Sequence, residues 1–238
     1  PSFSKFEVSG PDAEAFLNRI TANKLPQLPH SDPATGQTSG GGIVLSHALN
    51  ANGRIQTEFT ITRLAADRFY LLSGAYAHLC DVDLLHQSKL AGEQVTIRDI
   101  TNDYSVLIVA GPRSRELLTQ LTEQELSNAA FRWLTGKEIT VAGIPVRALR
   151  VNYVGELGWE LHVPMAQVAA LYAAIWAAGE RLGIADFGLY AMNSLRLEKA
   201  YAGWGVELTN EITPVEAGIQ RFVRLDKEFV GKAGVIKA

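Results

Sequence analysis

Alternating apolar and polar positions mark the strands in the first half of the chain. Within 54–63, Phe59 and Ile61 share one side of an extended backbone, and Glu58 falls on the other side. A similar run at 42–50 precedes it, and the Asn-Ala-Asn-Gly segment between the two runs is a strong hairpin signal. Further strands are expected at residues 5–9, 69–72 and 95–100, and helices at 11–21 and 75–90.

The second half of the chain alternates between strands and helices in the same way. The expected helix at 165–182 is apolar most of the way round, which indicates burial between layers. In the first half, the helix at 75–90 is expected to bury Leu79, Val82 and Leu85. The remaining second-half elements are strands at 104–110, 138–141, 147–153, 159–163 and 221–225, and helices at 113–121 and 188–201.

An internal repeat links the two halves. Residues 8–21 align with 109–122 at a constant offset of 101, with Val, Gly, Pro, Leu and Thr at matching positions. Repeats of this kind imply related units that pack together. The short strands and hairpins favour an α+β fold over a doubly wound sheet. We therefore expect two split-βαβ (ferredoxin-like) antiparallel units with a pseudo-twofold repeat. They span 1–102 and 103–212, and 213–238 follows.

The stretch 152–161, Asn-Tyr-Val-Gly-Glu-Leu-Gly-Trp-Glu-Leu, carries a carboxylate beside apolar residues. Its two glycines allow a tight turn, and Glu160 then lies next to surface that the core would bury. A buried carboxylate needs a partner, because an unpaired buried charge is costly. One interpretation is a structural hairpin in which Glu160 caps a loop or pairs with an arginine.

A second interpretation of Glu160 comes from the repeat. Glu58 follows Gly53 by five residues, as Glu160 follows Gly155, and the two carboxylates are offset by 102. Two units related by a twofold axis would then place both carboxylates around one central cavity. Chance is the competing explanation, because glutamate is common.

Composition and charge narrow the function classes. The net charge of −3 argues against a nucleic-acid binder, and 47% hydrophobic with 20% charged residues is ordinary for a globular protein. The sequence has no apolar run of about 20 residues, so no membrane contact is expected. The single cysteine, Cys80, excludes an internal disulfide and is expected to be a buried structural thiol. The five histidines lack the spacing of a metal site. The chain begins at Pro1 without methionine, which suggests a fragment, a processed product or a separate subunit.

Four phrases of the sequence resemble a known family. They are YVGELGWEL at 153–161, YAMNSLRLEKAYAGWG at 190–205, TPVEAGI at 213–219 and FVGK at 229–232. Together they resemble the folate-binding aminomethyltransferase superfamily, whose best-known member is the glycine cleavage T-protein. The branch they resemble most is the C-terminal folate domain of dimethylglycine dehydrogenase, dimethylglycine oxidase and sarcosine dehydrogenase.

The resemblance implies a three-domain cloverleaf around a folate channel. This chain would supply two of the domains, and a C-terminal β-barrel would be missing from it. A flavin amine oxidase domain would lie upstream and carry the FAD, because no G-x-G-x-x-G motif follows a strand here. Members of the family work in the bacterial cytoplasm or the mitochondrial matrix.

The resemblance also implies a reaction. Tetrahydrofolate would accept a one-carbon unit from an iminium produced by demethylation of dimethylglycine or sarcosine, giving 5,10-methylenetetrahydrofolate. Glu58 would be the catalytic carboxylate, assisting proton removal and stabilising the cationic iminium. Tyr153 and Glu160 would bind the pterin, whose adjacent N–H donors suit a carboxylate. The remaining folate-binding positions that the resemblance implies are Thr57, Phe59, Leu161 and His162.

Departures from the family pattern leave alternatives open. The T-protein has Asp-Asp where this chain has Thr57-Glu58, and Arg-Asp where it has Met192-Asn193. The first departure favours the dehydrogenase branch, and the second puts a lipoyl-protein donor in doubt. A T-protein-like aminomethyltransferase and a non-catalytic folate-binding or regulatory relative remain the alternatives. Arg196, Glu198 and Lys199 are expected to be scaffold, and the loop at 24–42 is expected to be a surface loop or a lid.

Overall fold

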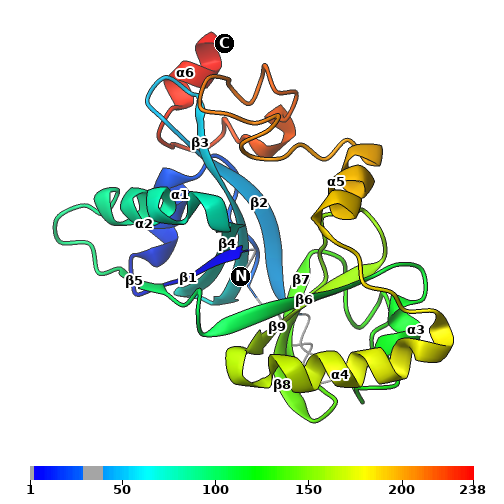
Figure 1. Ribbon diagram of the computed structural model, residues 1–238. Helices are drawn as coiled ribbons and strands as arrows, with labels where there is room; N and C mark the ends of the chain where they lie inside the picture. Colours follow the sequence, from blue (N-terminus) through cyan, green and yellow to red (C-terminus); the bar gives the residue numbers. More distant parts are fainter. Residues whose placement is uncertain (1–2, 29–39) are drawn as a thin grey trace. The chain divides into compact units, whose positions relative to one another are not determined.

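The computed structural model describes residues 3–28 and 40–238 of the chain (Figure 1). These residues divide into two compact units. Unit 1 holds 3–28, 41–101 and 202–238, and unit 2 holds 40 and 102–201. Residues 202–212 therefore belong to unit 1, whereas the sequence-based division put them in the second unit. Most of the expected surface loop at 24–42 lies outside the described residues.

Unit 1 is built on an antiparallel sheet with the strand order β5-β1-β4-β3-β2. The predicted hairpin between β2 and β3 is confirmed: the Gly53 backbone N–H donates to the Asn50 carbonyl, and the Asn50 side-chain oxygen accepts from the Asn52 and Arg54 N–H groups. Gly53 has a φ of +79°, which glycine adopts without steric cost. In chain order the elements are β1 (Phe3–Ser9), α1 (Ala13–Ile20), β2 (Gly41–Leu49), β3 (Ile55–Ala65), β4 (Arg68–Gly74), a 3₁₀ turn (Ala75–Ala77), α2 (His78–Gln87) and β5 (Thr96–Asp99).

One face of the unit 1 sheet packs against α1 and α2. Phe59 and Ile61 of β3 share a buried cluster with Phe16 of α1 and Leu85 of α2. The period-two prediction for β3 is confirmed, because Glu58 directly precedes Phe59 on the strand and therefore lies on the face away from the helices. We call this second face the open face of the unit 1 sheet.

The buried side predicted for α2 is wrong in part. Leu79 is 77% exposed, and the fully buried side chains of the helix are Asp81 and Leu85. The helix proper begins at His78, after the separate 3₁₀ turn Ala75–Ala77. Leu79 and Leu85 are six residues apart and therefore lie about 120° apart around an α-helix, so the predicted buried side was too wide. Cys80 is also exposed, so the expectation of a buried thiol was wrong.

The last segment of the chain, 202–238, packs on unit 1. Phe229 and Val235 share a buried cluster with Leu49 and Ile55. The Lys227 ammonium donates to the carbonyls of Thr21 and Asn23, beyond the end of α1. The strand predicted at 221–225 is absent, and this region instead contains a 3₁₀ turn (Gln220–Phe222) followed by α6 (Lys232–Lys237).

Unit 2 follows the element order of unit 1 in part: a strand, a helix, three strands and a helix recur, whereas no strand in the described residues of unit 2 corresponds to β5. Its strands pair in the order β7-β8-β9-β6, and all the pairs are antiparallel. Strand β6 corresponds to β1, and the hairpin β7-β8 and strand β9 correspond to β2-β3 and β4. The elements are β6 (Tyr104–Ala110), α3 (Ser114–Leu118), β7 (Thr135–Val141), β8 (Ile144–Leu149), β9 (Gly158–Pro164), 3₁₀ turns (Met165–Gln167, Glu180–Leu182) flanking α4 (Val168–Gly179), and α5 (Leu189–Glu198).

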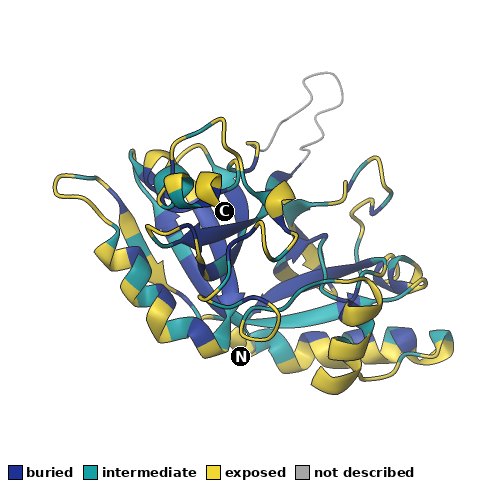
Figure 2. Cartoon of the chain, turned by 90° about the horizontal axis from the view of Figure 1, so that it is seen from above, coloured by how far each residue is buried: buried dark blue, intermediate teal, exposed yellow. Residues whose placement is uncertain are grey.

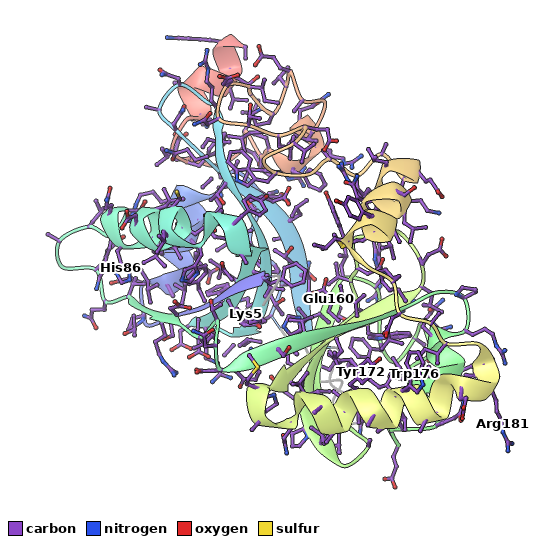
Figure 3. All side chains as sticks on the ribbon, viewed as in Figure 1. Lys5, His86, Glu160, Tyr172, Trp176 and Arg181 are labelled. Atoms are coloured by element: carbon purple, nitrogen blue, oxygen red, sulfur yellow. The ribbon has the colours of Figure 1, made fainter. Side chains whose placement is uncertain are left out.

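Helices α3 and α4 cover one face of the unit 2 sheet. Trp159 and Leu161 of β9 pack in one buried cluster with Leu171 and Ile175 of α4. The opposite side of α4 is exposed, and it carries the stacked rings of Tyr172 and Trp176 (Figure 3). The expectation that this helix is buried between layers was therefore wrong. Figure 2 shows the same pattern generally, with long exposed stretches on the helices and buried positions along the strands.

No helix within residues 3–28 and 40–238 combines the length and apolar character needed to cross a membrane. In the same residues, no group of three or more His, Cys, Asp or Glu side chains is arranged to hold a metal ion.

Candidate functional site

Glu58 lies opposite a buried histidine on the neighbouring strand. The register of β2 and β3 pairs His47 with Glu58, and His47 Nε2 is 3.0 Å from Glu58 Oε2. The His47 side chain is fully buried, while that of Glu58 is 22% exposed. The His47 ring also lies 6.0 Å, between centroids, from the ring of Phe222. Glu58 is therefore a reachable carboxylate that is held by a buried imidazole.

The two neighbours of Glu58 point the other way. Phe59 is fully buried in the cluster that β3 forms with α1 and α2, and Thr57 is 2% exposed on the same side. Of the three site positions predicted on β3, the structure presents only the side chain of Glu58 on the open face of the sheet. The side chains of Thr57 and Phe59 therefore pack β3 against the helices and are not presented on the open face of the sheet.

The connection before β9 differs from the tight turn that the sequence suggested. Strand β8 ends at Leu149 and β9 begins at Gly158, so Asn152 and Tyr153 lie in a loop rather than on a strand. Asn152 organises this loop, because its side chain donates to the Glu156 carbonyl and accepts from the Val154 N–H.

The two glycines of this connection are required for different reasons. Gly155 has a φ of +69°, and a Cβ there would lie 2.4 Å from Lys199 Cγ. Gly158 instead lies close to β6, where a Cβ would be 2.7 Å from the Val109 carbonyl oxygen. One glycine therefore permits the loop conformation, and the other permits close strand packing.

Glu160 is buried, and its partner is a histidine of its own strand. Along β9, Trp159 and Leu161 enter the core, which leaves Glu160 and His162 on the face away from the helices. Glu160 Oε2 is 3.3 Å from His162 Nε2, and the two side chains are 7% and 0% exposed. Of the predicted wall residues, His162 thus accompanies Glu160 (labelled in Figure 3), and the Leu161 side chain does not.

Tyr153 is positioned by the end of α5. Its ring stacks on Tyr201 with centroids 6.4 Å apart. The Arg196 guanidinium donates to the Tyr201 carbonyl at 2.8 Å and to the side chain of Asn193. Arg196 is 3% exposed, which agrees with the scaffold role expected for it. It supports Tyr201, and Tyr201 in turn contacts Tyr153, which is predicted to bind the pterin.

The proposed equivalence of Glu58 and Glu160 is wrong at the level of topology. Glu58 lies on β3, which corresponds to β8 in unit 2, whereas Glu160 lies on β9, which corresponds to β4. The shared spacing from a glycine therefore does not reflect equivalent positions. What the two carboxylates do share is a place on the helix-free face of their own sheet and a fully buried histidine beside them. Their meeting at one cavity stays a prediction.

His47 is a residue that the sequence analysis missed. It contacts Glu58 across two strands, and that contact depends on the register of the hairpin. The turn alone did not reveal the contact. Leu49 pairs with Ile55, and a β-bulge between Ala48 and Leu49 then shifts the register by one residue, so counting straight back from the turn would have placed His47 opposite Thr57 instead of Glu58.

Comparison with known proteins identifies the family. Residues 1–227 match the model of the GCVT N-terminal domain. The mitochondrial dimethylglycine dehydrogenase of Mus musculus is 39% identical over 97% of this chain and 25% of its own length. An aminomethyltransferase of a Thermoanaerobacter species is 30% identical over 97% of this chain and 60% of its own length. This chain therefore spans only part of each relative.

A solved structure shares the fold of this chain. The crystal structure of glycine cleavage system aminomethyltransferase T from Bartonella henselae matches with a TM-score of 0.81 at 23% identity, covering 99% of this chain and 60% of that one. The resemblance suggested by the four sequence phrases is confirmed. The chain is an aminomethyltransferase-like domain related to the dimethylglycine and sarcosine dehydrogenases, and it belongs to the GCVT N-terminal domain family.

Proposed function

We propose that this chain is a tetrahydrofolate-dependent one-carbon transferase domain. It would form 5,10-methylenetetrahydrofolate from an iminium produced by demethylation of dimethylglycine or sarcosine. The observation that carries the proposal is the pair of carboxylates, Glu58 and Glu160, each on the helix-free face of its sheet and each held by a buried histidine. Family membership supports the same reaction class.

Glu160 suits the recognition of a pterin. It is a carboxylate with 7% exposure, and burial makes an uncompensated charge costly unless donors approach it. The 2-amino-4-oxo edge of a pterin offers two adjacent N–H donors, which a carboxylate accepts in a bidentate manner. Tyr153, carried by the connection that runs into β9, would add a ring and a hydroxyl to the same site. His162 would hold the carboxylate in place.

Glu58 suits proton transfer and charge stabilisation. Its side chain is 22% exposed, so a bound amine can reach it, whereas His47 behind it is closed to solvent. A carboxylate in this position would accept the proton that a folate nitrogen loses on attacking the one-carbon donor. Its negative charge would also stabilise the cationic iminium before the attack.

The proposal includes other domains of a longer protein. The chain covers 25% of the mouse dimethylglycine dehydrogenase. We propose that an upstream flavin amine oxidase domain, which carries the FAD, supplies the iminium, and that a C-terminal β-barrel completes a cloverleaf around the folate. The compartment would be the bacterial cytoplasm or the mitochondrial matrix. A T-protein-like enzyme with a protein-bound donor is the alternative, supported by the match to the Thermoanaerobacter aminomethyltransferase.

Product analysis tests the proposal. The whole protein that contains this chain is given dimethylglycine or sarcosine with tetrahydrofolate, and 5,10-methylenetetrahydrofolate and free formaldehyde are measured at early times. We expect the methylene product in preference to formaldehyde. Formaldehyde alone, at the same rate with and without tetrahydrofolate, would overturn the proposed function. Transfer only from an aminomethylated lipoyl protein would replace it with the alternative.

A further inference from the structure

We propose that His47 is a positioning residue that holds the Glu58 carboxylate for proton transfer by donating a hydrogen bond from Nε2 as a neutral imidazole. The inference rests on the proposed role of Glu58, and it assigns a function to a residue outside the predicted site. It concerns unit 1 alone, because both residues lie on the β2-β3 hairpin.

The contact is short and is fixed by the backbone. The two residues are direct partners in the register of β2 and β3, and Nε2 lies 3.0 Å from Oε2. The imidazole is fully buried and packs near the Phe222 ring, so it cannot move away into solvent. A fixed donor at Oε2 sets the plane of the carboxylate. The other oxygen, Oε1, is then the one available to accept a proton.

The surroundings of the ring determine its charge. Within the described residues, His47 Nδ1 is buried and has no hydrogen-bond partner. A doubly protonated imidazolium would therefore bury an unsatisfied N–H donor together with a positive charge, and both are costly. The neutral form with its proton on Nε2 leaves only a lone pair at Nδ1. His47 accordingly donates to Glu58 rather than competing with it for the transferred proton.

Burial of the imidazole requires a compensating contact. A buried imidazole costs free energy unless it is hydrogen-bonded, and His47 makes that contact with Glu58. Glu160 and His162 make the same kind of pair, but along one strand instead of across two. Because β3 and β9 are not equivalent strands, the repeat does not explain both pairs. The shared feature is a buried donor behind each functional carboxylate.

Two substitutions of similar size separate positioning from packing. His47→Gln keeps an N–H donor near the position of Nε2, whereas His47→Leu fills the space without a donor. His86→Gln is the control, because His86 is an exposed residue of α2 far from β3 in Figure 3. Each variant of the whole protein is assayed for the rate of methylene transfer and for its dissociation constant for tetrahydrofolate.

We expect His47→Leu to lower the transfer rate roughly 10- to 100-fold, with the folate dissociation constant within about twofold of the parent. His47→Gln should recover most of the rate, and His86→Gln should match the parent. An unchanged rate in His47→Leu, or equal losses in the Leu and Gln variants, would overturn the proposal.

Nitrogen-15 NMR of histidine-labelled protein gives a readout that does not depend on activity. The His47 signals should report a proton on Nε2 and none on Nδ1, and Glu58→Leu should shift the Nε2 signal. A ring protonated on both nitrogens, or only on Nδ1, would overturn the proposal. If the unmodified protein binds no tetrahydrofolate, the proposed function fails, and the positioning role fails with it. If the parent binds tetrahydrofolate but His47→Leu transfers methylene at the parent rate, only the positioning role fails, and the proposed folate binding by Glu160 stands.

Discussion

The rings of Tyr153 and Tyr201 stack with their centroids 6.4 Å apart and their planes 26° from parallel. Tyr201 lies just beyond α5, where Arg196 donates to its carbonyl. Tyr153 lies in the connection that leads into β9 and Glu160. The end of α5 therefore positions an aromatic ring that the proposed function assigns to pterin binding.

Removing this support should weaken folate binding without removing a ligand. Tyr201→Ala deletes the ring against which Tyr153 stacks, and such aromatic pairs are worth about 0.5–1.5 kcal/mol. We expect the dissociation constant for tetrahydrofolate to rise roughly 3- to 10-fold. Tyr190→Ala is a suitable control, because Tyr190 is 95% exposed on α5. Equal affinities of the Tyr201 variant and the parent would contradict the stacking argument.

Glu58→Gln should separate binding from transfer. The amide keeps the size of the side chain and accepts from His47, but it carries no negative charge and cannot take up a proton. We expect folate affinity to stay within about twofold, while methylene transfer falls roughly 100-fold or more. The measurement is single-turnover formation of 5,10-methylenetetrahydrofolate. Equal rates for the variant and the parent would remove Glu58 from the mechanism.

Asp81 should make unit 1 less stable near neutral pH. Burial raises the pKa of this carboxyl, and a hydrogen bond from the Ser73 hydroxyl at 2.5 Å only partly opposes the effect. A carboxyl with a raised pKa in the folded state contributes stability below its unfolded pKa, and that contribution is lost as the pH rises through the folded value.

Asp81→Asn therefore tests this titration directly. The amide stays neutral and can still accept from Ser73, so the variant should exceed the parent in unfolding free energy near about pH 7. The difference should shrink as the pH falls through the raised pKa of the folded state toward the ordinary range of aspartate, and it should stay constant below that range. Urea denaturation at several pH values measures it. A difference that does not change with pH would show that Asp81 does not titrate as described.

Lys227 should produce a pH dependence in the alkaline range. Burial lowers its pKa to about 8, against the opposing charge of Asp226. The unfolded chain then binds more protons than the folded chain between about 8 and the ordinary lysine value of 10.5. The stability contributed by this group therefore rises with pH across that window and is flat below it.

Lys227→Met removes the titration together with the bonds to the Thr21 and Asn23 carbonyls. The unfolding free energy of the parent, compared with that of the variant, should increase from about pH 8 to about pH 10. Lys237→Met, a change in the last turn of α6, controls for the loss of a positive charge. Parallel curves for the parent and Lys227→Met would contradict the assignment.

Patterns over a few neighbouring residues predicted which side chains of β3 face the core and where a helix ends. Alternation placed Phe59 and Glu58 on opposite faces of β3, because side chains of a strand alternate regardless of its neighbours. A glycine after a helical run is a typical helix end, and Gly183 has the left-handed conformation required there. The buried side of α2 was mispredicted at Leu79, because Leu79 and Leu85 lie about 120° apart around an α-helix and Leu85 is the one that reaches the core.

Properties that depend on pairing between distant strands were not predictable in this way. The spacing of Glu58 and Glu160 from glycines suggested equivalent positions, but one glycine ends a short hairpin and the other lies in the longer connection 150–157. His47 was missed because its partner is set by strand register. The alternation around Glu58 was therefore predictable from the sequence, whereas the residue that contacts its side chain was not.

Calorimetric titration with tetrahydrofolate tests the central claim most directly. It compares the whole protein with Glu160→Ala and with the surface control His86→Gln. We predict binding by the parent and the control, and a loss of at least roughly tenfold in affinity for Glu160→Ala, because charge-assisted hydrogen bonds to the pterin are removed. Absence of binding by the parent, or equal affinities of parent and Glu160→Ala, would contradict the claim that this domain holds folate through Glu160.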